Sequence, residues 1–207
     1  MNIRVKINNY GGLLIAFDGP NGVGKTTLIN KLYDKLTKNG YDVVKTKEPT
    51  ESELGKFVRE KSEFIGGNAL ACLISADRYQ HIKEEIIPML KKKKIILCDR
   101  YILSSYILQG MDGVEEKFIY NLNNDIIIPD IQFVLIASTN TIQKRLKMRN
   151  NLSRFEKNNK TNLELQYLVQ GLERLKKNNI IEYTFNTEQD ICITIEQMFN
   201  IIISYLK

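Results

Sequence analysis

Residues 13–27 read LLIAFDGPNGVGKTT, and this stretch decides the fold. Its first five residues form an apolar run of the kind that suits a buried strand. The residues that follow, 19–26, match the pattern G-x-x-x-x-G-K-[ST] in full. After them apolar residues recur at helical spacing from Leu28 to Leu36. The stretch therefore predicts a strand, a glycine-rich loop and a helix in that order, which is the arrangement that holds a phosphate group.

The residue types at positions 19–27 suit the binding of a nucleoside triphosphate together with Mg²⁺. Glycines let backbone N–H groups turn toward phosphate oxygens, and the helix N-terminus adds positive potential. Lys25 is expected against the β- and γ-phosphates, and the Thr26 hydroxyl is expected to ligate Mg²⁺. A glycine-rich turn without a ligand would give no reason for a lysine followed by a threonine. The predicted ATP-binding residues are Gly19, Pro20, Asn21, Gly22, Val23, Gly24, Lys25, Thr26 and Thr27.

Short apolar runs alternate with longer amphipathic ones along the rest of the sequence. Besides residues 13–17, strands are predicted at 41–47, 94–99, 131–138 and 180–185. Strands that alternate with helices predict a parallel sheet with helices on both faces. We therefore expect an α/β fold of the P-loop NTPase type, three layers (α/β/α) around a five-stranded parallel sheet, as a single domain over residues 1–207. The helices are predicted at 25–38, 51–64, 69–90 (ending near Pro88), 104–109, 114–123, 141–149, 163–177 and 190–206.

Composition excludes several classes of protein. The 207 residues are 43% hydrophobic and 26% charged, as in ordinary globular proteins. No apolar run approaches the roughly 20 residues that a membrane span needs, and the first residues lack the apolar stretch of a signal peptide. The three scattered cysteines indicate reduced thiols. The net charge of +6 favours anionic partners, but the basic run at 91–94 has no interleaved aromatics to stack bases. We expect a cytoplasmic protein with neither a membrane nor a nucleic acid as partner.

Several blocks of sequence follow one another along nearly the whole chain. They are FDGPNGVGKTT (17–27), KEPTESELGKFVRE (47–60), ALACLISADRYQH (69–81), ILCDRYILSSYILQG (96–110), PDIQFVLIAS (129–138) and RLKMRNNLSRFE (145–156). With these blocks the chain resembles the thymidylate kinase family. Found together in this order and at this spacing, the blocks indicate the family more specifically than any one of them does alone. The resemblance implies an ATP- and Mg²⁺-dependent kinase that converts dTMP to dTDP, and it implies a homodimer.

Several of these blocks supply residues for a phosphate acceptor. Asp99 and Arg100 follow a predicted strand, at the sheet edge where open α/β sheets bind ligands. A guanidinium suits bidentate binding of a phosphate, and a carboxylate could hold Mg²⁺ or a water bound to it. A structural ion pair between the two is the alternative. The resemblance implies that Arg78 reaches the acceptor base, the alternative being a surface salt bridge with Asp77 or Glu85. The predicted substrate-binding residues are Glu48, Pro49, Arg78, Asp99, Arg100, Ser104, Ser105 and Gln109, and the predicted metal ligands are Thr26 and Asp99.

Transfer between two phosphate groups needs cations from more than one direction. The polar segment at about 149–160 lies between two predicted helices and is expected to form a short mobile lid. Because the loop interior, residues 20–23, holds no arginine, the resemblance implies that a lid arginine stabilises the transferring charge. A solvated basic loop is the alternative. The predicted catalytic residues are Lys25, Arg100, Arg149 and Arg154.

Three residues near the expected acceptor depart from the family pattern. Asn21 stands where family members usually carry an aspartate, Ile74 replaces an aromatic that stacks on thymine, and Leu108 replaces a Tyr or Phe. An aliphatic wall still buries apolar surface, but the loss of an aromatic contact can cost about 1 kcal/mol. Two other functions therefore stay open. One is a kinase of the same fold acting on another nucleoside monophosphate, and the other is a nucleotide-binding regulator with a decayed acceptor site.

Overall fold

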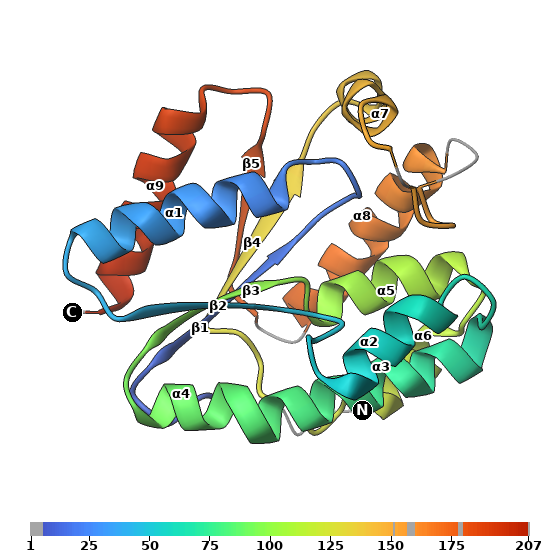
Figure 1. The fold of residues 1–207 in the computed structure, drawn as a ribbon, viewed down its shortest axis with the longest axis horizontal. Coiled ribbons are helices and arrows are strands. Elements are labelled where there is room, and N and C mark those ends of the chain that lie inside the picture. Colours follow the sequence, from blue (N-terminus) through green and yellow to red (C-terminus); the bar gives the residue numbers. More distant parts are fainter. Residues whose placement is uncertain (1–5, 151, 157–159, 178–179, 207) are drawn as a thin grey trace.

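A central sheet of parallel strands organises the computed structural model, which describes residues 6–150, 152–156, 160–177 and 180–206 (Figure 1). The strand order is β2-β3-β1-β4-β5, so β1 lies in the middle and pairs with both β3 and β4. The prediction of an α/β fold with a five-stranded parallel sheet is confirmed. The strands are β1 (Leu13–Asp18), β2 (Val43–Lys47), β3 (Ile95–Asp99), β4 (Ile131–Ile136) and β5 (Glu182–Asn186).

Helices connect the strands, and each helix predicted from the sequence is present with its ends moved by a few residues. In the described part of the chain, no helix combines the length and the apolarity that crossing a membrane requires. A π-helical turn, η1, joins α3 to α4. The helices are α1 (Lys25–Lys38), α2 (Glu53–Lys61), α3 (Gly67–His81), η1 (Ile82–Ile86), α4 (Ile87–Lys91), α5 (Ile102–Met111), α6 (Glu116–Leu122), α7 (Thr139–Lys147), α8 (Thr161–Lys177) and α9 (Ile191–Tyr205).

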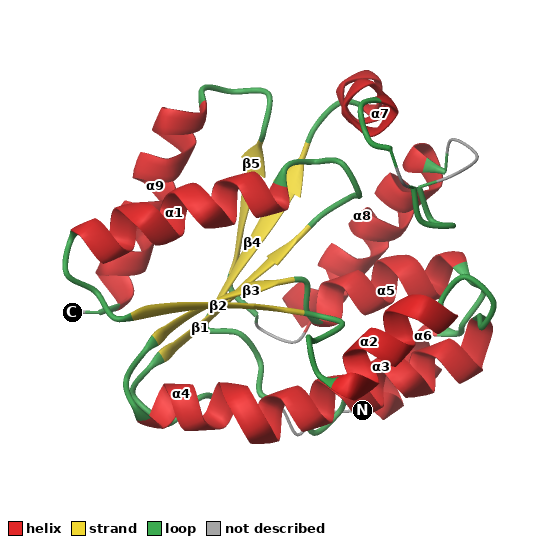
Figure 2. Cartoon of the chain, in the orientation of Figure 1, coloured by secondary structure: helices red, strands yellow, loops and turns green. Residues whose placement is uncertain are grey.

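The sheet lies between two helical layers, as Figure 2 shows, and its central strand sends side chains into both. Ile15 and Phe17 of β1 enter a core that includes residues of α1 and α9. Leu14 and Ala16 enter a second core, which includes residues of α3, α5 and α8. Burial on both faces explains why β1 reads as a continuous apolar run and not as an alternating pattern.

The helix predicted over residues 69–90 is present, but its geometry changes just before Pro88. α3 passes through η1 into α4, which ends at Lys91, so the helix ends close to Pro88 as predicted. Proline has no backbone N–H, and its ring crowds the carbonyl four residues earlier, at Glu84. The wider π turn lies where that hydrogen bond is lost. The helix therefore accommodates the proline instead of ending at it.

The segment predicted as a lid, 149–160, has no helix or strand among its described residues. Positions 151 and 157–159 lie outside the described residues. Phe155 packs with Val58 of α2 and Leu70 of α3 in a small third core. Phe155 therefore lies against α2 and α3, and the mobility of the segment stays a prediction.

Candidate active site

The loop between β1 and α1 has a backbone that glycine alone adopts readily. Gly19 has a φ of 151° and Gly24 a φ of 109°. A Cβ atom on Gly19 would lie 2.3 Å from the carbonyl oxygen of Leu135, so a side chain does not fit there. Gly24 leads directly into α1, whose first N–H groups have no partner within the helix. This arrangement presents backbone donors at a helix N-terminus, where anions bind.

The Lys25 side chain folds back into the loop and is buried. Its Nζ donates hydrogen bonds to the carbonyl oxygens of Gly19, at 2.9 Å, and Pro20, at 3.0 Å. Burial lowers the pKa of Lys25 to about 7, and the charge of Arg100 acts in the same direction. A polyphosphate bound beside the ammonium would oppose this shift. The protonation of Lys25 is therefore expected to depend on whether the donor is bound.

Thr26 and Asp99 meet at the edge of the loop, and their oxygens suit a hard cation. The Thr26 hydroxyl donates to Asp99 Oδ2 at 2.9 Å. Asp99 Oδ1 is buried and has no hydrogen-bond partner among the described residues. Such a pair fits Mg²⁺, which takes oxygen ligands and often only one or two from the protein. The described residues contain no group of three or more His, Cys, Asp or Glu side chains that could hold a metal ion without help from phosphate or water.

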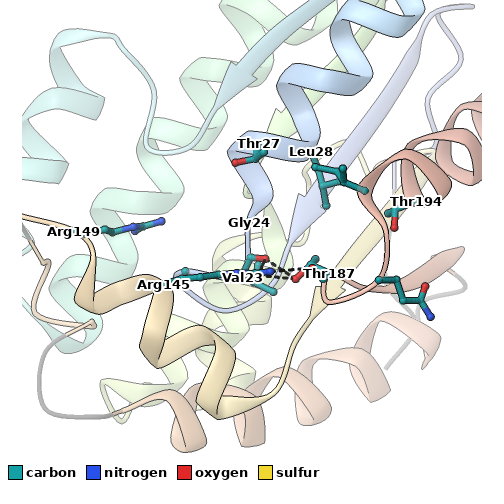
Figure 3. Close-up of a pocket in the computed structure, with 11 residues that line it drawn as sticks. Val23, Gly24, Thr27, Leu28, Arg145, Arg149, Thr187 and Thr194 are labelled. Carbon is teal, nitrogen blue, oxygen red and sulfur yellow. Dashed lines mark hydrogen bonds between the residues drawn. The ribbon is translucent and has the colours of Figure 1, made fainter.

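A pocket of ≈ 360 Å³ opens beside the loop, next to α7 (Figure 3). Arg145 of α7 fixes one wall, because its Nη1 donates to the Val23 carbonyl at 2.7 Å and to the Thr187 hydroxyl at 2.9 Å. The Thr187 hydroxyl donates to the same carbonyl at 2.7 Å. Since the pocket continues from the phosphate-binding loop, it has the position of a nucleoside site for the donor. The other lining residues are Gly22, Gly24, Thr27, Leu28, Arg149, Gln189, Ile191 and Thr194.

Arg100 lies between two pockets and lines both. Its backbone φ is 74°, a left-handed conformation that is strained for a residue other than glycine. Nη1 donates to the Ser104 hydroxyl at 3.0 Å, and Nη2 donates to the Asn21 amide oxygen at 2.6 Å. On one side it shares a pocket of ≈ 160 Å³ with Lys25 and Thr26. On the other side it shares a pocket with residues of α3 and α5.

This second pocket brings together residues that lie far apart in the sequence. Of the predicted substrate-binding residues, Asp99 alone is absent from its lining and lies on the loop side. Gln109 Oε1 is buried there without a partner among the described residues, so it could accept an N–H from a base. The pocket volume is ≈ 30 Å³, so its walls must separate to admit a base. The lining residues are Glu48, Pro49, Ile74, Arg78, Arg100, Tyr101, Ser104, Ser105, Leu108 and Gln109.

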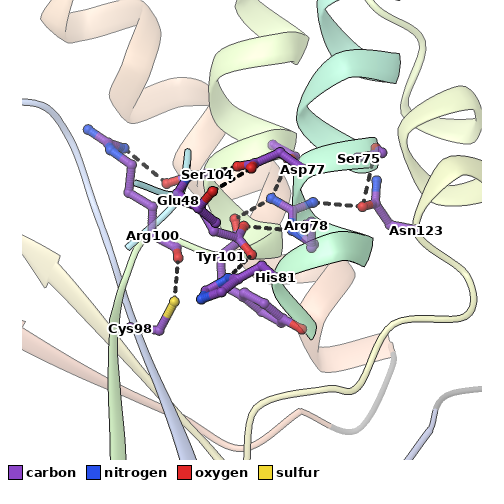
Figure 4. A network of polar contacts seen from close by, with 12 residues as sticks. Glu48, Ser75, Asp77, Arg78, His81, Cys98, Arg100, Tyr101, Ser104 and Asn123 are labelled. Atoms are coloured by element: carbon purple, nitrogen blue, oxygen red, sulfur yellow. Dashed lines mark hydrogen bonds and ion pairs between the residues drawn. The ribbon is translucent and has the colours of Figure 1, made fainter. Parts of the chain in front are cut away.

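Arg78 is held in the wall of this pocket by a buried polar network (Figure 4). Its Nε donates to Glu48 Oε2 at 2.7 Å, and its Nη1 donates to Asn123 Oδ1 at 2.6 Å. Its Nη2 donates to the Ser105 hydroxyl at 3.0 Å, and His81 Nδ1 lies 3.1 Å from Glu48 Oε1. Burial opposes the charge, but Glu48, Tyr101 and Asp18 together outweigh it, and the pKa of Arg78 is raised. The partner of Arg78 is thus neither of the two carboxylates that the sequence suggested as alternatives.

The structure separates the two predicted lid arginines. Arg149 lines both the nucleoside pocket and the loop pocket, and its Nη1 lies 2.6 Å from Glu156 Oε1. The Arg154 guanidinium instead forms an ion pair with Asp112 and lies over the ring of Phe155, 4.1 Å from its centroid. In this conformation Arg149 faces the donor side, and Arg154 faces the end of α5.

Two buried carboxylates near the site were missed by the sequence analysis. Asp18 ends β1 and accepts hydrogen bonds from the backbone nitrogens of Tyr101, at 3.2 Å, and Ser104, at 3.0 Å. Its signal was a charged residue at the end of an apolar run. Glu164 on α8 accepts hydrogen bonds from Asn21 and carried no signal, because it lies in a polar stretch among many charged residues. Thr187, after β5, also belonged to no motif.

A phosphate-binding loop that shares an arginine with a second pocket is the arrangement of a P-loop nucleoside monophosphate kinase. A sequence profile of thymidylate kinases matches residues 17–194, and the chain belongs to the thymidylate kinase family. The chain is 35% identical to a probable thymidylate kinase of Methanocaldococcus jannaschii over 202 residues, which cover 94% of this chain and 96% of that protein. It is 36% identical to a thymidylate kinase of Finegoldia magna over 154 residues, which cover 70% and 76%.

A solved structure supports the same assignment. The crystal structure of thymidylate kinase from Ehrlichia chaffeensis superposes with a TM-score of 0.71 at 25% identity. The match covers 93% of this chain and 98% of that one. The resemblance read from the sequence is therefore confirmed, and the protein is a nucleoside monophosphate kinase, a phosphotransferase. These findings favour neither a regulator with a decayed acceptor site nor a kinase of another specificity.

Proposed function

We propose that the protein transfers the γ-phosphoryl group of ATP to dTMP, giving ADP and dTDP. The observation that carries this proposal is the position of Arg100, which lines both the loop pocket and the acceptor pocket. A guanidinium at that junction can bind the acceptor phosphate while the donor phosphates lie against the loop. Thymidine as the nucleoside follows from the names of the relatives.

Each charged residue of the site has a role in this proposal. An oxygen of the acceptor phosphate attacks the γ-phosphorus, and the bond from that phosphorus to the β–γ bridging oxygen breaks. Lys25 binds the β- and γ-phosphates, Arg100 orients the acceptor, and Arg149 approaches the transferring group from the donor side. Thr26 and Asp99 would hold Mg²⁺, which neutralises phosphate charge when bound. A general base is not required, because the acceptor phosphate is already ionised near neutral pH.

Recognition of the base is assigned to residues of α3 and α5. Gln109 offers an unpartnered acceptor, and its amide group can also donate, so it can pair with a pyrimidine edge. Arg78 donates to Ser105 and is fixed by Glu48, so it positions the wall of the pocket. Ile74 supplies an apolar face against which a ring can lie.

A panel of monophosphates tests the proposal. Purified protein is given ATP and Mg²⁺ with dTMP, dUMP, dCMP, dGMP or dAMP, and diphosphate formation is measured for each. We expect the highest kcat/KM for dTMP. Equal or faster turnover of another member of the panel would reject dTMP as the preferred acceptor.

A second candidate acceptor is another deoxynucleoside monophosphate. Although the comparisons do not favour it, the aliphatic side chains of Ile74 and Leu108 in the pocket motivate it, since neither can stack on thymine as an aromatic ring does. The same panel decides between the two, because an aliphatic wall that does not select thymine predicts similar kcat/KM values for dTMP and dUMP.

Family membership also motivates proposals about the setting of the enzyme. We propose a homodimer of single-domain chains in the cytoplasm, with neither nucleic acid nor membrane as partner. Sedimentation equilibrium measures the mass of the assembly, and a monomer at micromolar concentration would reject the dimer. Recovery of the protein in a membrane fraction would reject the location.

A further inference from the structure

Glu164 is a buried carboxylate near the start of α8, and the proposed reaction does not use it. The residue is 2% exposed. Its Oε1 accepts two hydrogen bonds from Asn21 of the phosphate-binding loop, from the backbone nitrogen at 2.9 Å and from Nδ2 at 3.0 Å. Burying a carboxylate is costly unless it is hydrogen-bonded, and here the phosphate-binding loop supplies both bonds from one residue, Asn21. The contact therefore ties α8 to the donor loop.

The bonds to Glu164 decide which way the Asn21 amide points. A carboxylate only accepts hydrogen bonds, so Nδ2 must face Glu164. The amide oxygen is then left to face Arg100, whose guanidinium only donates, and Nη2 donates to it at 2.6 Å. An asparagine has the one donor group and the one acceptor that this bridge needs. An aspartate at position 21 would instead face Glu164 with a second negative charge.

Arg100 is held in the same manner on its other side. Its Nη1 donates to the Ser104 hydroxyl at 3.0 Å, and that hydroxyl donates to the carboxylate of Asp18. Arg100 itself forms no direct ion pair among the described residues, because each carboxylate is reached through a neutral side chain. Its positive charge is therefore left available for a phosphate, while its geometry is fixed from two directions.

We infer that Glu164 is a positioning residue for phosphoryl transfer, which aims Arg100 and fixes the phosphate-binding loop through Asn21. This inference rests on the proposed function, in which Arg100 binds the acceptor phosphate. The pKa of Glu164 is raised overall, chiefly by burial. The charges of Arg100 and Lys25 and the hydrogen bond from the Asn21 backbone act against this rise.

The test compares four variants at the bridge with one control. Glu164→Ala removes the bridge, and Glu164→Gln keeps the hydrogen bonds without the charge. Asn21→Asp sets two carboxylates against each other, and the double variant Asn21→Asp with Glu164→Gln restores one donor and one acceptor. Glu173→Ala, exposed on the same helix, is the control. The dTMP affinity is measured by calorimetry without ATP, and kcat/KM is measured with ATP at several pH values.

We expect Glu164→Ala to lose about tenfold or more in both dTMP affinity and kcat/KM, since hydrogen bonds to charged groups are among the strong ones. Asn21→Asp should lose more activity at high pH than at low pH, because one shared proton relieves the repulsion. Adding Glu164→Gln should restore activity and remove that pH dependence. A role of Glu164 confined to stability would leave the pH profile unchanged.

Other outcomes overturn the inference. The inference is rejected if Glu164→Ala has the same dTMP affinity and kcat/KM as Glu173→Ala. It is also rejected if the double variant has no higher kcat/KM than Asn21→Asp alone. If Glu164→Ala does not fold, the volume-conserving Gln variants decide the matter. If the wild-type protein phosphorylates no monophosphate, the proposed function fails, while the dTMP affinities still test the inference.

Discussion

The Thr26 hydroxyl donates to Asp99 Oδ2 at 2.9 Å and leaves Asp99 Oδ1 buried, with no partner among the described residues. Thr26 is the second residue of α1, whereas Asp99 is the last residue of β3. The contact therefore joins the helix that follows the donor loop to a neighbouring strand. An unpaired buried carboxylate oxygen costs free energy unless a ligand completes its bonding. The pair is therefore arranged for a cation that arrives with the donor.

Replacing Asp99 by Asn should weaken the response to Mg²⁺, because the charge is lost while the shape is kept. We expect the Mg²⁺ concentration for half-maximal activity to rise about 10- to 100-fold. Asp34→Asn, exposed on α1, is the control and should match the wild type. An unchanged Mg²⁺ titration in Asp99→Asn would show that this carboxylate does not hold the ion.

Binding of a nucleoside triphosphate should be accompanied by uptake of a proton at Lys25. Burial lowers the pKa of this group to about 7 without ligand, so at about pH 8 most of it is neutral. Phosphate oxygens beside it would raise the pKa again, and the complex would bind a proton. Below about pH 6 the group is already charged, and the uptake should vanish.

Calorimetry in buffers of different ionisation enthalpy measures this uptake. Lys25→Arg is the control, because a guanidinium stays charged and cannot take up a proton in this range. Equal proton uptake in the wild type and in Lys25→Arg would assign the proton to another group.

Arg100→Ala should abolish most of the transfer while donor binding survives. Arg100 lines the acceptor pocket, and a cation that stabilises transferring phosphate charge is worth about 10³-fold or more in rate. Binding of a fluorescent ATP analogue and turnover of dTMP are measured on the same preparation. Equal losses in the two measurements would contradict an acceptor-side role for Arg100.

Local sequence was enough to predict the sheet and the donor loop. The central strands β1, β3 and β4 are apolar because both of their faces are buried, and the loop residues are contiguous, so both leave a signal within a short window. Arg100 was predictable because it directly follows a strand. Glu164 was not, since its contact with Asn21 spans 143 residues and depends on how α8 packs. The π turn before Pro88 was not predicted either, because local sequence does not show how a helix accommodates a missing hydrogen bond.

Removing Glu48 should destabilise the protein strongly, because Arg78 would stay buried without its charge partner. The two residues are almost fully buried and their charged atoms lie 2.7 Å apart. Breaking a buried pair by removing one partner costs about 3–5 kcal/mol. Urea unfolding of Glu48→Ala without ligand measures the loss. Glu51→Ala, an exposed carboxylate that pairs with Lys47, is the control and should unfold near the wild-type midpoint.

The two lid arginines should respond differently to replacement by Ala. Arg149 lines the loop pocket, so Arg149→Ala should lower kcat by about 10²-fold or more while stability changes little. Arg154 pairs with Asp112, so Arg154→Ala should break that ion pair. Its main effect should then be on stability or on the position of the segment at 149–160, and not directly on kcat.

A double-mutant cycle on Arg154 and Asp112 decides whether Arg154 also reaches the transferring phosphate. If Arg154 acts only through the pair, Asp112→Ala should reproduce the effect of Arg154→Ala on kcat, and the double variant should add nothing further. If Arg154 leaves Asp112 during turnover and binds phosphate, Asp112→Ala should retain kcat or raise it, because the competing carboxylate is gone. Arg154→Ala would then lower kcat in either background. Steady-state kinetics with dTMP and ATP distinguishes these results, and the second would add Arg154 to Arg149 as a residue that contacts the reacting groups.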